Sequence, residues 1–251
     1  MVFHYDPKKK FFLVSLELEN RPGALGNLAN LLGIRGMNML EGFFGANTAE
    51  SNGTVSFFLE SANSRLDERW LKEFIESSVG VQDVEVKGSV EGFLADSLNF
   101  PVVWNTGDRS IVMRMEYVRK IFDAVRKGIG ASGDQVIYNQ GFDYGKATWV
   151  NTFSVFRPTS VAALSEVLQI YSAVGWGQVA LLELDVKTRR ARITMTDGFE
   201  CTGLATGKAE SYFVRGHIAG AMSAYFGTDV KASETKCLSM GDKHCEFELS
   251  P

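Results

Sequence analysis

Two of the three cysteines of this chain, Cys237 and Cys245, lie close together near its C-terminus. Gly241 and Asp242 lie between them, and such a pair of residues is typical of a tight turn. A turn centred near Gly241 predicts a β-hairpin in which the two cysteines lie opposite each other, with both side chains on one face. Two such thiols can fill a core, form a disulfide or hold a metal ion, and the pattern leaves these three alternatives open.

Residues around this pair offer further ligands for a metal ion. Opposed thiols whose Cα atoms are about 5 Å apart can converge on one ion. Glu234, three residues before Cys237, would join them if a bulge or bend brought its side chain round. His244 is expected to point away from Cys245, because neighbouring residues of a strand face opposite sides. An odd number of cysteines fits a reducing compartment with free or metal-bound thiols.

The composition limits the kind of protein that carries these residues. A length of 251 residues suits two domains of roughly 100–150 residues each. The apolar fraction of 45% is ordinary for a globular protein, and no apolar run approaches the about 20 residues of a membrane span. The first residues lack the apolar segment of a secretion signal, and the net charge of −4 comes without a long basic run. We therefore expect a cytoplasmic protein that binds neither nucleic acid nor membrane.

Residues 11–87 predict the element order β-α-β-β-α-β. The first strand shows apolar residues that alternate with more polar ones, and the helix after it shows an apolar stripe. Residues 37–46 and 54–60 are expected to form two strands around an Asn52–Gly53 turn. A second helix, capped near residue 64, and a short strand complete the unit.

The segment after this unit is rich in glycine, asparagine and proline and is only weakly periodic. Such segments are typical of domain boundaries. The sequence therefore predicts a first domain over residues 1–88, a linker over residues 89–106 and a second domain over residues 107–251.

The first helix of the N-terminal domain is preceded by a distinctive turn. Free N–H groups at a helix start can bind a carboxylate, and glycine lets a ligand approach the backbone. A tight turn that needs glycine only for its geometry is the alternative. The element order, together with the Arg-Pro-Gly-Ala-Leu run, resembles an ACT domain, the regulatory module of many enzymes of amino-acid metabolism, over about residues 10–87. The resemblance implies a ferredoxin-like fold, a dimer with sheets side by side, and, where a ligand binds, an amino acid held near Asn20, Arg21, Pro22, Gly23, Ala24 and Leu25.

The second half predicts a mixed α/β domain. Apolar residues recur every three or four positions over residues 111–129, and a second helical stretch follows over residues 134–147. Glycines four residues apart, at Gly141 and Gly145 and again at Gly216 and Gly220, favour close helix packing over a pocket wall. The remaining expected elements are a helix after Pro158, a β-hairpin over residues 179–196, a helix over residues 209–226 and the cysteine-bearing hairpin.

The run from Ser211 to Gly220, followed by Glu-x-x-Cys and Gly-Asp-x-x-Cys, resembles the end of a 4-vinyl-reductase-like domain. The resemblance covers about residues 100–249, and the family includes sensor modules of aromatic-responsive transcription activators. It implies a pocket for a small, largely apolar molecule next to a structural zinc ion held by one glutamate and three cysteines. Three of these ligands match Glu234, Cys237 and Cys245, whereas the fourth falls at Ser211, and serine is a poor zinc ligand. Cys201 or His217 would then take its place.

Motifs for catalysis are absent from the sequence. The chain has no Gly-x-Ser-x-Gly elbow, no Walker-type phosphate loop and no His-Glu-x-x-His pair. The leading hypothesis is a regulatory protein without enzymatic activity, a homodimer through its ACT-like domain, which binds a small molecule in each module and passes its signal to a partner protein. An accessory reductase of tetrapyrrole or aromatic metabolism and a pure oligomerisation module are the alternatives.

Overall fold

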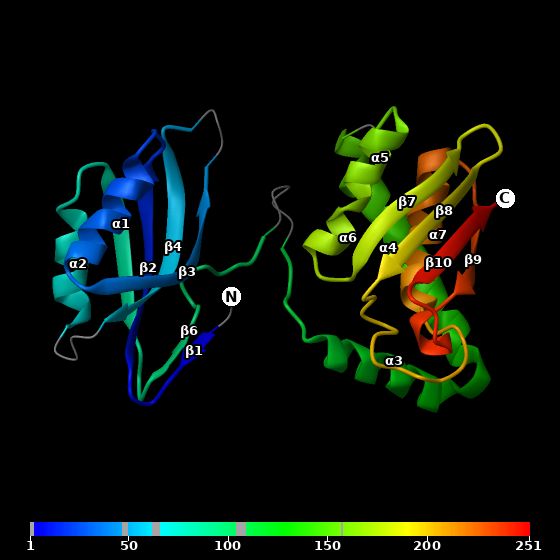
Figure 1. Ribbon diagram of the computed structural model, residues 1–251, viewed down its shortest axis with the longest axis horizontal. Coiled ribbons are helices and arrows are strands. Elements are labelled where there is room, and N and C mark those ends of the chain that lie inside the picture. The colour runs from blue at the N-terminus through cyan, green and yellow to red at the C-terminus, as the bar shows by residue number, and fades with distance from the viewer. Residues whose placement is uncertain (1–2, 47–49, 62–65, 104–108, 157) are drawn as a thin grey trace. The chain divides into compact units, whose positions relative to one another are not determined.

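The computed structural model describes residues 3–46, 50–61, 66–103, 109–156 and 158–251 of the chain. The chain divides into two compact units, Met1–Ser110 and Ile111–Pro251 (Figure 1). No helix among the described residues combines the length and the hydropathy that a membrane span requires.

The first unit has the predicted order of strands and helices. Its four main strands form an antiparallel sheet in the order β3-β4-β2-β5. Both helices pack on one face of this sheet, because the alternating apolar residues of β2 share one core with the apolar stripes of α1 and α2. The elements are β1 (Phe3–Tyr5), β2 (Lys10–Glu19), α1 (Ala24–Ile34), β3 (Met37–Gly45), β4 (Asn52–Ser61), α2 (Glu68–Glu76), β5 (Val81–Gly88) and β6 (Phe93–Ala95).

Two local predictions for this unit differ from the structure. The Asn52–Gly53 turn is wrong, because both residues belong to β4 and pair with Glu19 and Leu18 of β2. Pairing across the sheet therefore outweighs the local turn preference of Asn-Gly. The second helix begins at Glu68, where the Asp67 carboxylate accepts a hydrogen bond from the Trp70 amide at 2.7 Å. The cap predicted at residue 64 lies outside the described residues.

The segment predicted as a linker contributes to the first unit. β6 pairs with β1 in a two-stranded antiparallel sheet. Leu94 of β6 joins a small apolar cluster with Phe11, Leu13 and Phe58, three buried side chains that lie outside the core shared by α1 and α2. Residues 89–95 therefore add structure that their weak periodicity did not indicate.

The second unit has four antiparallel strands in the order β7-β8-β10-β9. Figure 1 shows α4 and α7 behind this sheet. Its elements are α3 (Met115–Ile129), η1 (Gly130–Ser132), α4 (Gly133–Asn151), η2 (Phe153–Phe156), α5 (Val161–Leu168), α6 (Ile170–Ala173), β7 (Gln178–Asp185), β8 (Arg190–Thr196), α7 (Tyr212–Phe226), β9 (Lys231–Lys236), η3 (Leu238–Met240) and β10 (Cys245–Ser250).

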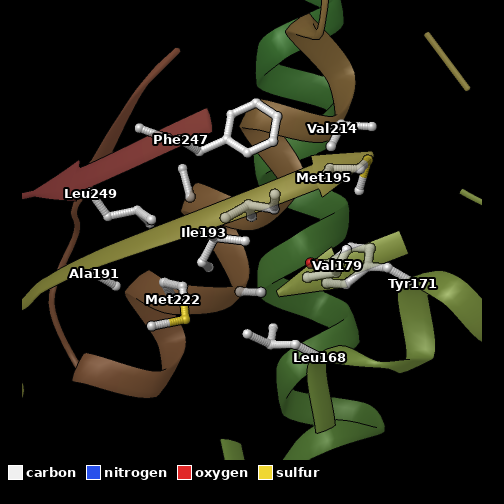
Figure 2. Close-up of a cluster of buried hydrophobic side chains, with 14 of the residues drawn as sticks. Leu168, Tyr171, Val179, Ala191, Ile193, Met195, Val214, Met222, Phe247 and Leu249 are labelled. Carbon is white, nitrogen blue, oxygen red and sulfur yellow. The ribbon is translucent and has the colours of Figure 1, made fainter. Parts of the chain in front are cut away.

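The inner face of this sheet packs against α7 and α6. Alternate residues of β8 and β10, such as Ile193 and Phe247, point toward Met222 and Val214 of α7 (Figure 2). Tyr171 of α6 lies in the same core and is 2% exposed. The period of two in the strands and the nearly continuous burial of α7 explain why this helix has no polar face over its middle turns.

Four glycines bring the backbones of α4 and α7 into direct contact. A Cβ atom built at Gly145 would lie 2.0 Å from the carbonyl oxygen of His217, and one at Gly220 would lie 2.0 Å from that of Phe142. Gly141 and Gly216 have equivalent contacts at 2.2 and 2.1 Å. The predicted role of these glycines in close helix packing is therefore confirmed.

Candidate metal centre and aromatic cluster

The C-terminal hairpin differs from the predicted one. β9 ends at Lys236 and β10 begins at Cys245, so Cys237 lies beyond the paired residues and is not directly opposite Cys245. The connection contains η3, and the Asp242 carboxylate accepts a hydrogen bond from the Cys237 amide at 2.9 Å. Gly241 has a φ of +95°, a left-handed conformation that favours glycine. This turn folds back so that the two Sγ atoms lie 3.7 Å apart.

A β-bulge in β9 brings Glu234 to the two cysteines. Two successive residues of β10 pair with Lys236 and Glu234, so Thr235 is an extra residue on β9. In a regular strand Glu234 and Cys237 would face opposite sides, because they are three residues apart. The extra residue shifts the alternation by one position, and the Glu234 carboxylate joins the thiols.

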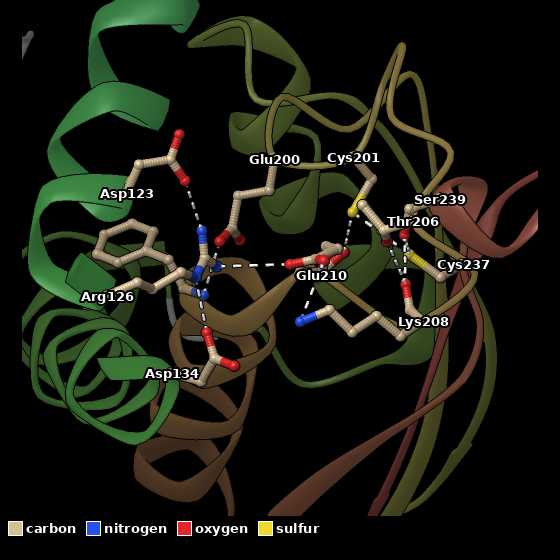
Figure 3. Close-up of polar contacts among 12 residues, drawn as sticks. Asp123, Arg126, Asp134, Glu200, Cys201, Thr206, Lys208, Glu210, Cys237 and Ser239 are labelled. Atoms are coloured by element: carbon tan, nitrogen blue, oxygen red, sulfur yellow. Dashed lines mark hydrogen bonds and ion pairs between the residues drawn. The ribbon is translucent and has the colours of Figure 1, made fainter. Parts of the chain in front are cut away.

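Cys201 supplies the third thiol from the segment that follows β8. Arg119 of α3 holds this segment, because its guanidinium donates to the carbonyl oxygens of Phe199 and Thr202, both at 2.6 Å. Cys201 Sγ lies 3.3 Å from Cys237 Sγ (Figure 3). All three cysteines are free and buried. The candidate ligand atoms of Cys201, Glu234, Cys237 and Cys245 lie within 4.8 Å of one another.

These distances fit a four-coordinate metal ion. Tetrahedral zinc, with Zn–S bonds of about 2.3 Å, keeps its sulfur ligands about 3.8 Å apart, and the measured Sγ–Sγ distances are 3.3 and 3.7 Å. Glu234 Oε1 is buried and has no hydrogen-bond partner among the described residues. A buried acceptor without a donor is costly, and a bound cation would satisfy it. The structure thus brings together all four residues that the sequence analysis named as metal ligands.

The protonation states within this thiol cluster depend on one another. Hydrogen bonds from the Cys201 and Cys245 thiols lower the pKa of Cys237. Burial, together with the nearby Cys237 sulfur, raises the pKa of Glu234 to about 8. The cluster therefore has one thiolate among protonated neighbours at neutral pH, and a divalent cation that binds there must displace those protons.

Helix α7 begins beside the thiol cluster and has an unusual cap. Ser211 occupies the N-cap position, but its hydroxyl makes no capping hydrogen bond. The Glu200 carboxylate takes this role and accepts hydrogen bonds from the amides of Phe213 at 3.0 Å and Val214 at 2.6 Å. Burial raises the pKa of Glu200 to about 7. Glu200 thereby connects the segment that carries Cys201 to the first turn of α7.

An ion-pair network fixes the approach to this helix. Arg126 of α3 lies 2.7 Å from the Asp134 carboxylate, 3.2 Å from that of Asp123 and 3.6 Å from that of Glu210 (Figure 3). Glu210 directly precedes Ser211 in the chain. The network therefore ties α3 and the start of α4 to the residue before Ser211.

His217 lies in a second cluster, further along α7, and not among the thiols. Its Nδ1 atom lies 2.8 Å from the Tyr171 hydroxyl and its Nε2 atom 3.3 Å from the Thr148 hydroxyl. Burial lowers the pKa of His217 to about 3, so the ring is neutral at pH 7. The aromatic rings nearest to it, with centroids 4.8–6.4 Å away, are those of Tyr144, Tyr171, Trp176 and Phe213. Of the two alternatives for the fourth metal ligand, Cys201 therefore has the required position.

Residues 191–251, which contain the four thiol-cluster residues and His217, match the 4-vinyl-reductase domain family. The chain is 30% identical over 132 residues to the uncharacterized protein MJ0150 of Methanocaldococcus jannaschii, an alignment that spans 51% of this chain and 72% of the relative. The chain belongs to the family of this archaeal protein. The domain match confirms the resemblance to 4-vinyl-reductase-like domains over residues 191–251, whereas the ACT resemblance of residues 10–87 stays a prediction.

Solved structures share the fold of this family member at low sequence identity. The phenol-responsive sensory domain of the transcription activator PoxR, solved with phenol, superposes with a TM-score of 0.52 at 18% identity, over 59% of this chain and 79% of that domain. A vinyl-4-reductase family protein from Methanocaldococcus jannaschii has a TM-score of 0.39 at 21% identity, over 56% of this chain and 83% of its own. At such identities the first of these likenesses concerns the fold alone.

The turn before α1, in the first unit, is open to solvent. Asn20, Arg21, Pro22, Gly23 and Leu25 are exposed, and only Ala24 is buried. Gly23 has a φ of +86° at the N-cap of α1, and a Cβ atom built there would meet no atom within 4 Å. The predicted amino-acid site at this turn stays a prediction.

Two residues of the 4-vinyl-reductase domain were missed as parts of a site. Glu200 gave no signal, because its role as a cap comes from a segment that lies well before α7 in the chain. Ser211 was regarded only as a substituted ligand, yet its hydroxyl lies 2.9 Å from Cys201 Sγ. That distance could have been anticipated only with the path of residues 197–210, which has no periodicity.

Proposed function

We propose that the chain is a small-molecule-responsive regulatory protein whose second unit binds a small, largely apolar molecule among the rings around His217. The observation that supports this most strongly is a neutral, buried histidine enclosed by aromatic rings on the helix that also borders the thiol cluster. Aromatic walls bind flat apolar molecules, and one polar pair fixes their orientation. The likeness in fold to a sensory domain that responds to phenol points to the same class of ligand.

The ligand site would have one polar end. With the ring of His217 neutral, one nitrogen donates and the other accepts a hydrogen bond. Tyr171 and Thr148 use these positions with hydroxyl groups. A ligand with a single hydroxyl, such as phenol, can exchange for one of these partners. Half-exposed Tyr144 lies at the border of the ring cluster, where a ligand would enter.

We further propose that the thiol cluster holds one structural zinc ion. Cys201, Cys237 and Cys245 would supply thiolates, and Glu234 would supply the Oε1 atom that has no partner among the described side chains. Three sulfur ligands favour zinc over the oxygen-preferring magnesium and calcium. With all four positions held by protein, the ion would have no open site for a substrate and would brace the start of α7.

The role proposed for the first unit is regulatory as well. Its β-α-β-β-α-β order and the exposed turn before α1 support an ACT-like module that forms a homodimer and binds an amino acid near residues 20–25. A cytoplasmic protein of this kind would pass its signal to a partner protein. Ligand binding acts through a difference in affinity between two arrangements of the protein.

Two measurements on the full chain test this function. Elemental analysis of untagged protein should find about one zinc per chain, and a Cys237→Ser/Cys245→Ser variant should lose it. Isothermal titration with phenol should show saturable binding that a His217→Ala variant weakens at least tenfold, whereas an Arg21→Ala variant in the other unit binds as the wild type does. Phenol binding that is equal in the wild type and the His217 variant would refute the proposed ligand site.

A further inference from the structure

Ser211 stands at a position where serine usually caps a helix, but its side chain is used elsewhere. Serine is among the preferred N-cap residues because its hydroxyl accepts a hydrogen bond from the first turn. In α7 the Glu200 carboxylate accepts the hydrogen bonds of Phe213 and Val214 instead. The Ser211 hydroxyl is therefore free from the helix that it precedes.

This hydroxyl and the amide of the same residue contact three of the four candidate ligands. Ser211 Oγ lies 2.9 Å from Cys201 Sγ and donates to Cys245 Sγ at 3.5 Å. The Ser211 amide donates to Glu234 Oε2 at 3.3 Å. The residue is 3% exposed, so these contacts do not compete with water.

The other hydroxyl beside the thiols is already used. Ser239 Oγ lies 2.9 Å from Cys237 Sγ, but it donates its proton to the Lys208 carbonyl oxygen at 2.7 Å. A serine has one hydroxyl proton, so Ser239 can receive but not give a hydrogen bond at Cys237 while that bond persists. Ser211 is the hydroxyl that can donate to sulfur.

We propose that Ser211 is a positioning residue of the metal site, which holds the thiolates of Cys201 and Cys245 and the carboxylate of Glu234 in place around the ion. This inference rests on the proposed metal site. Once the thiols have lost their protons, they can only accept hydrogen bonds, and the Ser211 hydroxyl is in place to donate. Groups that hold metal ligands in this way typically contribute roughly 10- to 100-fold in metal affinity.

Cobalt(II), whose absorption reports on sulfur ligands, tests the role of Ser211 in the full chain. A Ser211→Ala variant is expected to bind Co²⁺ roughly 10- to 100-fold more weakly than the wild type and to shift the sulfur-to-cobalt absorption bands. The helix keeps its cap, because Glu200 is unchanged. A Ser211→Thr variant keeps a hydroxyl and should keep the wild-type spectrum. Equal losses in both variants would show that packing and not the hydroxyl is responsible, and would overturn the proposal.

Ser160 provides a matched control. It is the N-cap of α5, and its hydroxyl accepts a hydrogen bond from the Ala163 amide at 3.1 Å. A Ser160→Ala variant should lower the unfolding temperature through the lost cap, yet it should bind Co²⁺ within about twofold of the wild type. Ser211→Ala should show the opposite pattern, which separates an effect on the metal site from a general loss of stability.

An exchange of side chains checks the geometry. Because Ser211 Oγ and Cys201 Sγ lie 2.9 Å apart, a Cys201→Ser/Ser211→Cys double variant should recover the three-sulfur absorption that Cys201→Ser alone loses. If the wild type bound neither zinc nor cobalt, the metal site itself would be refuted, and with it this role. If the wild type and Ser211→Ala bound cobalt with equal affinity and identical spectra, only the role of Ser211 would be refuted.

Discussion

Substitution of Gly220 by alanine tests the backbone contact between α4 and α7. The added Cβ would lie 2.0 Å from the Phe142 carbonyl oxygen and 2.9 Å from the Lys146 amide nitrogen, whereas ordinary contacts begin at 3.4 Å. Both neighbours are backbone atoms that cannot rotate away, so the helices must separate by about 1 Å. Overpacking of this kind costs about 1–3 kcal/mol, and a rigid backbone partner places it near the upper end.

The intrinsic helix preference works in the opposite direction. Alanine is favoured over glycine in a helix by about 1 kcal/mol, so we expect Gly220→Ala to be destabilised by about 2 kcal/mol overall. For a unit of this size, that corresponds to a fall of roughly 6–10 °C in unfolding temperature. Differential scanning calorimetry of the full chain measures it, in the transition that belongs to the second unit.

Gly128 in α3 is the matched control. It is exposed, and a Cβ atom built there meets nothing within 4 Å. Gly128→Ala therefore has only the helix-preference term and should stabilise the unit by about 0.5–1 kcal/mol. Unfolding temperatures that rise in both variants would refute the argument that the glycines are required for backbone contact.

Three further predictions concern the two clusters. Burial raises the folded pKa of Glu200 to about 7, above its unfolded value of about 4.3, so the folded state binds more protons between these values and stability falls as pH rises from about 4.5 to 7, by about 3 kcal/mol; Glu200→Gln should flatten this part of a urea-midpoint profile, and an unchanged slope would contradict the assignment. Zinc affinity in a chelator competition should rise with pH up to about 8, because Glu234 must lose its proton there, and a flat profile would exclude Glu234 as a ligand. Since His217 is neutral down to a pKa of about 3, phenol affinity should be constant between about pH 5 and 8, and a titration near the ordinary histidine pKa of about 6.5 would show that the ring is solvated.

Periodicity predicted the elements of both units but not their finer pairing. The alternation in β2 and the apolar stripes of α1 and α2 are local, so the order of elements in the first unit followed from residues 11–87. The Asn52–Gly53 turn failed because the whole length of β4 pairs with β2, and that pairing includes the two turn-forming residues. A local preference of this size is small against the sum of a long ladder.

The metal cluster was anticipated in its members but not in its geometry. The spacing of Cys237 and Cys245 suggested opposed strand positions, whereas η3 and the Asp242 cap make the connection that brings the thiols together. Glu234 needed a bulge, which was stated as a condition and which no residue type at Thr235 announces. Cys201 reaches the cluster on a segment held by Arg119, which lies 80 residues before Phe199 in the chain and is thus invisible to any local pattern.

The glycine contacts between α4 and α7 also limit how the two helices can move. Each glycine faces a carbonyl oxygen of the other helix, and the residues on either side of Gly216 and Gly220 carry side chains. A slide of one residue, about 1.5 Å, would place a side chain where only hydrogen fits, and the next equivalent fit is four residues away. The pair therefore behaves as one rigid lever, and a change that begins at Ser211 or His217 must leave through the loops and the sheet around it.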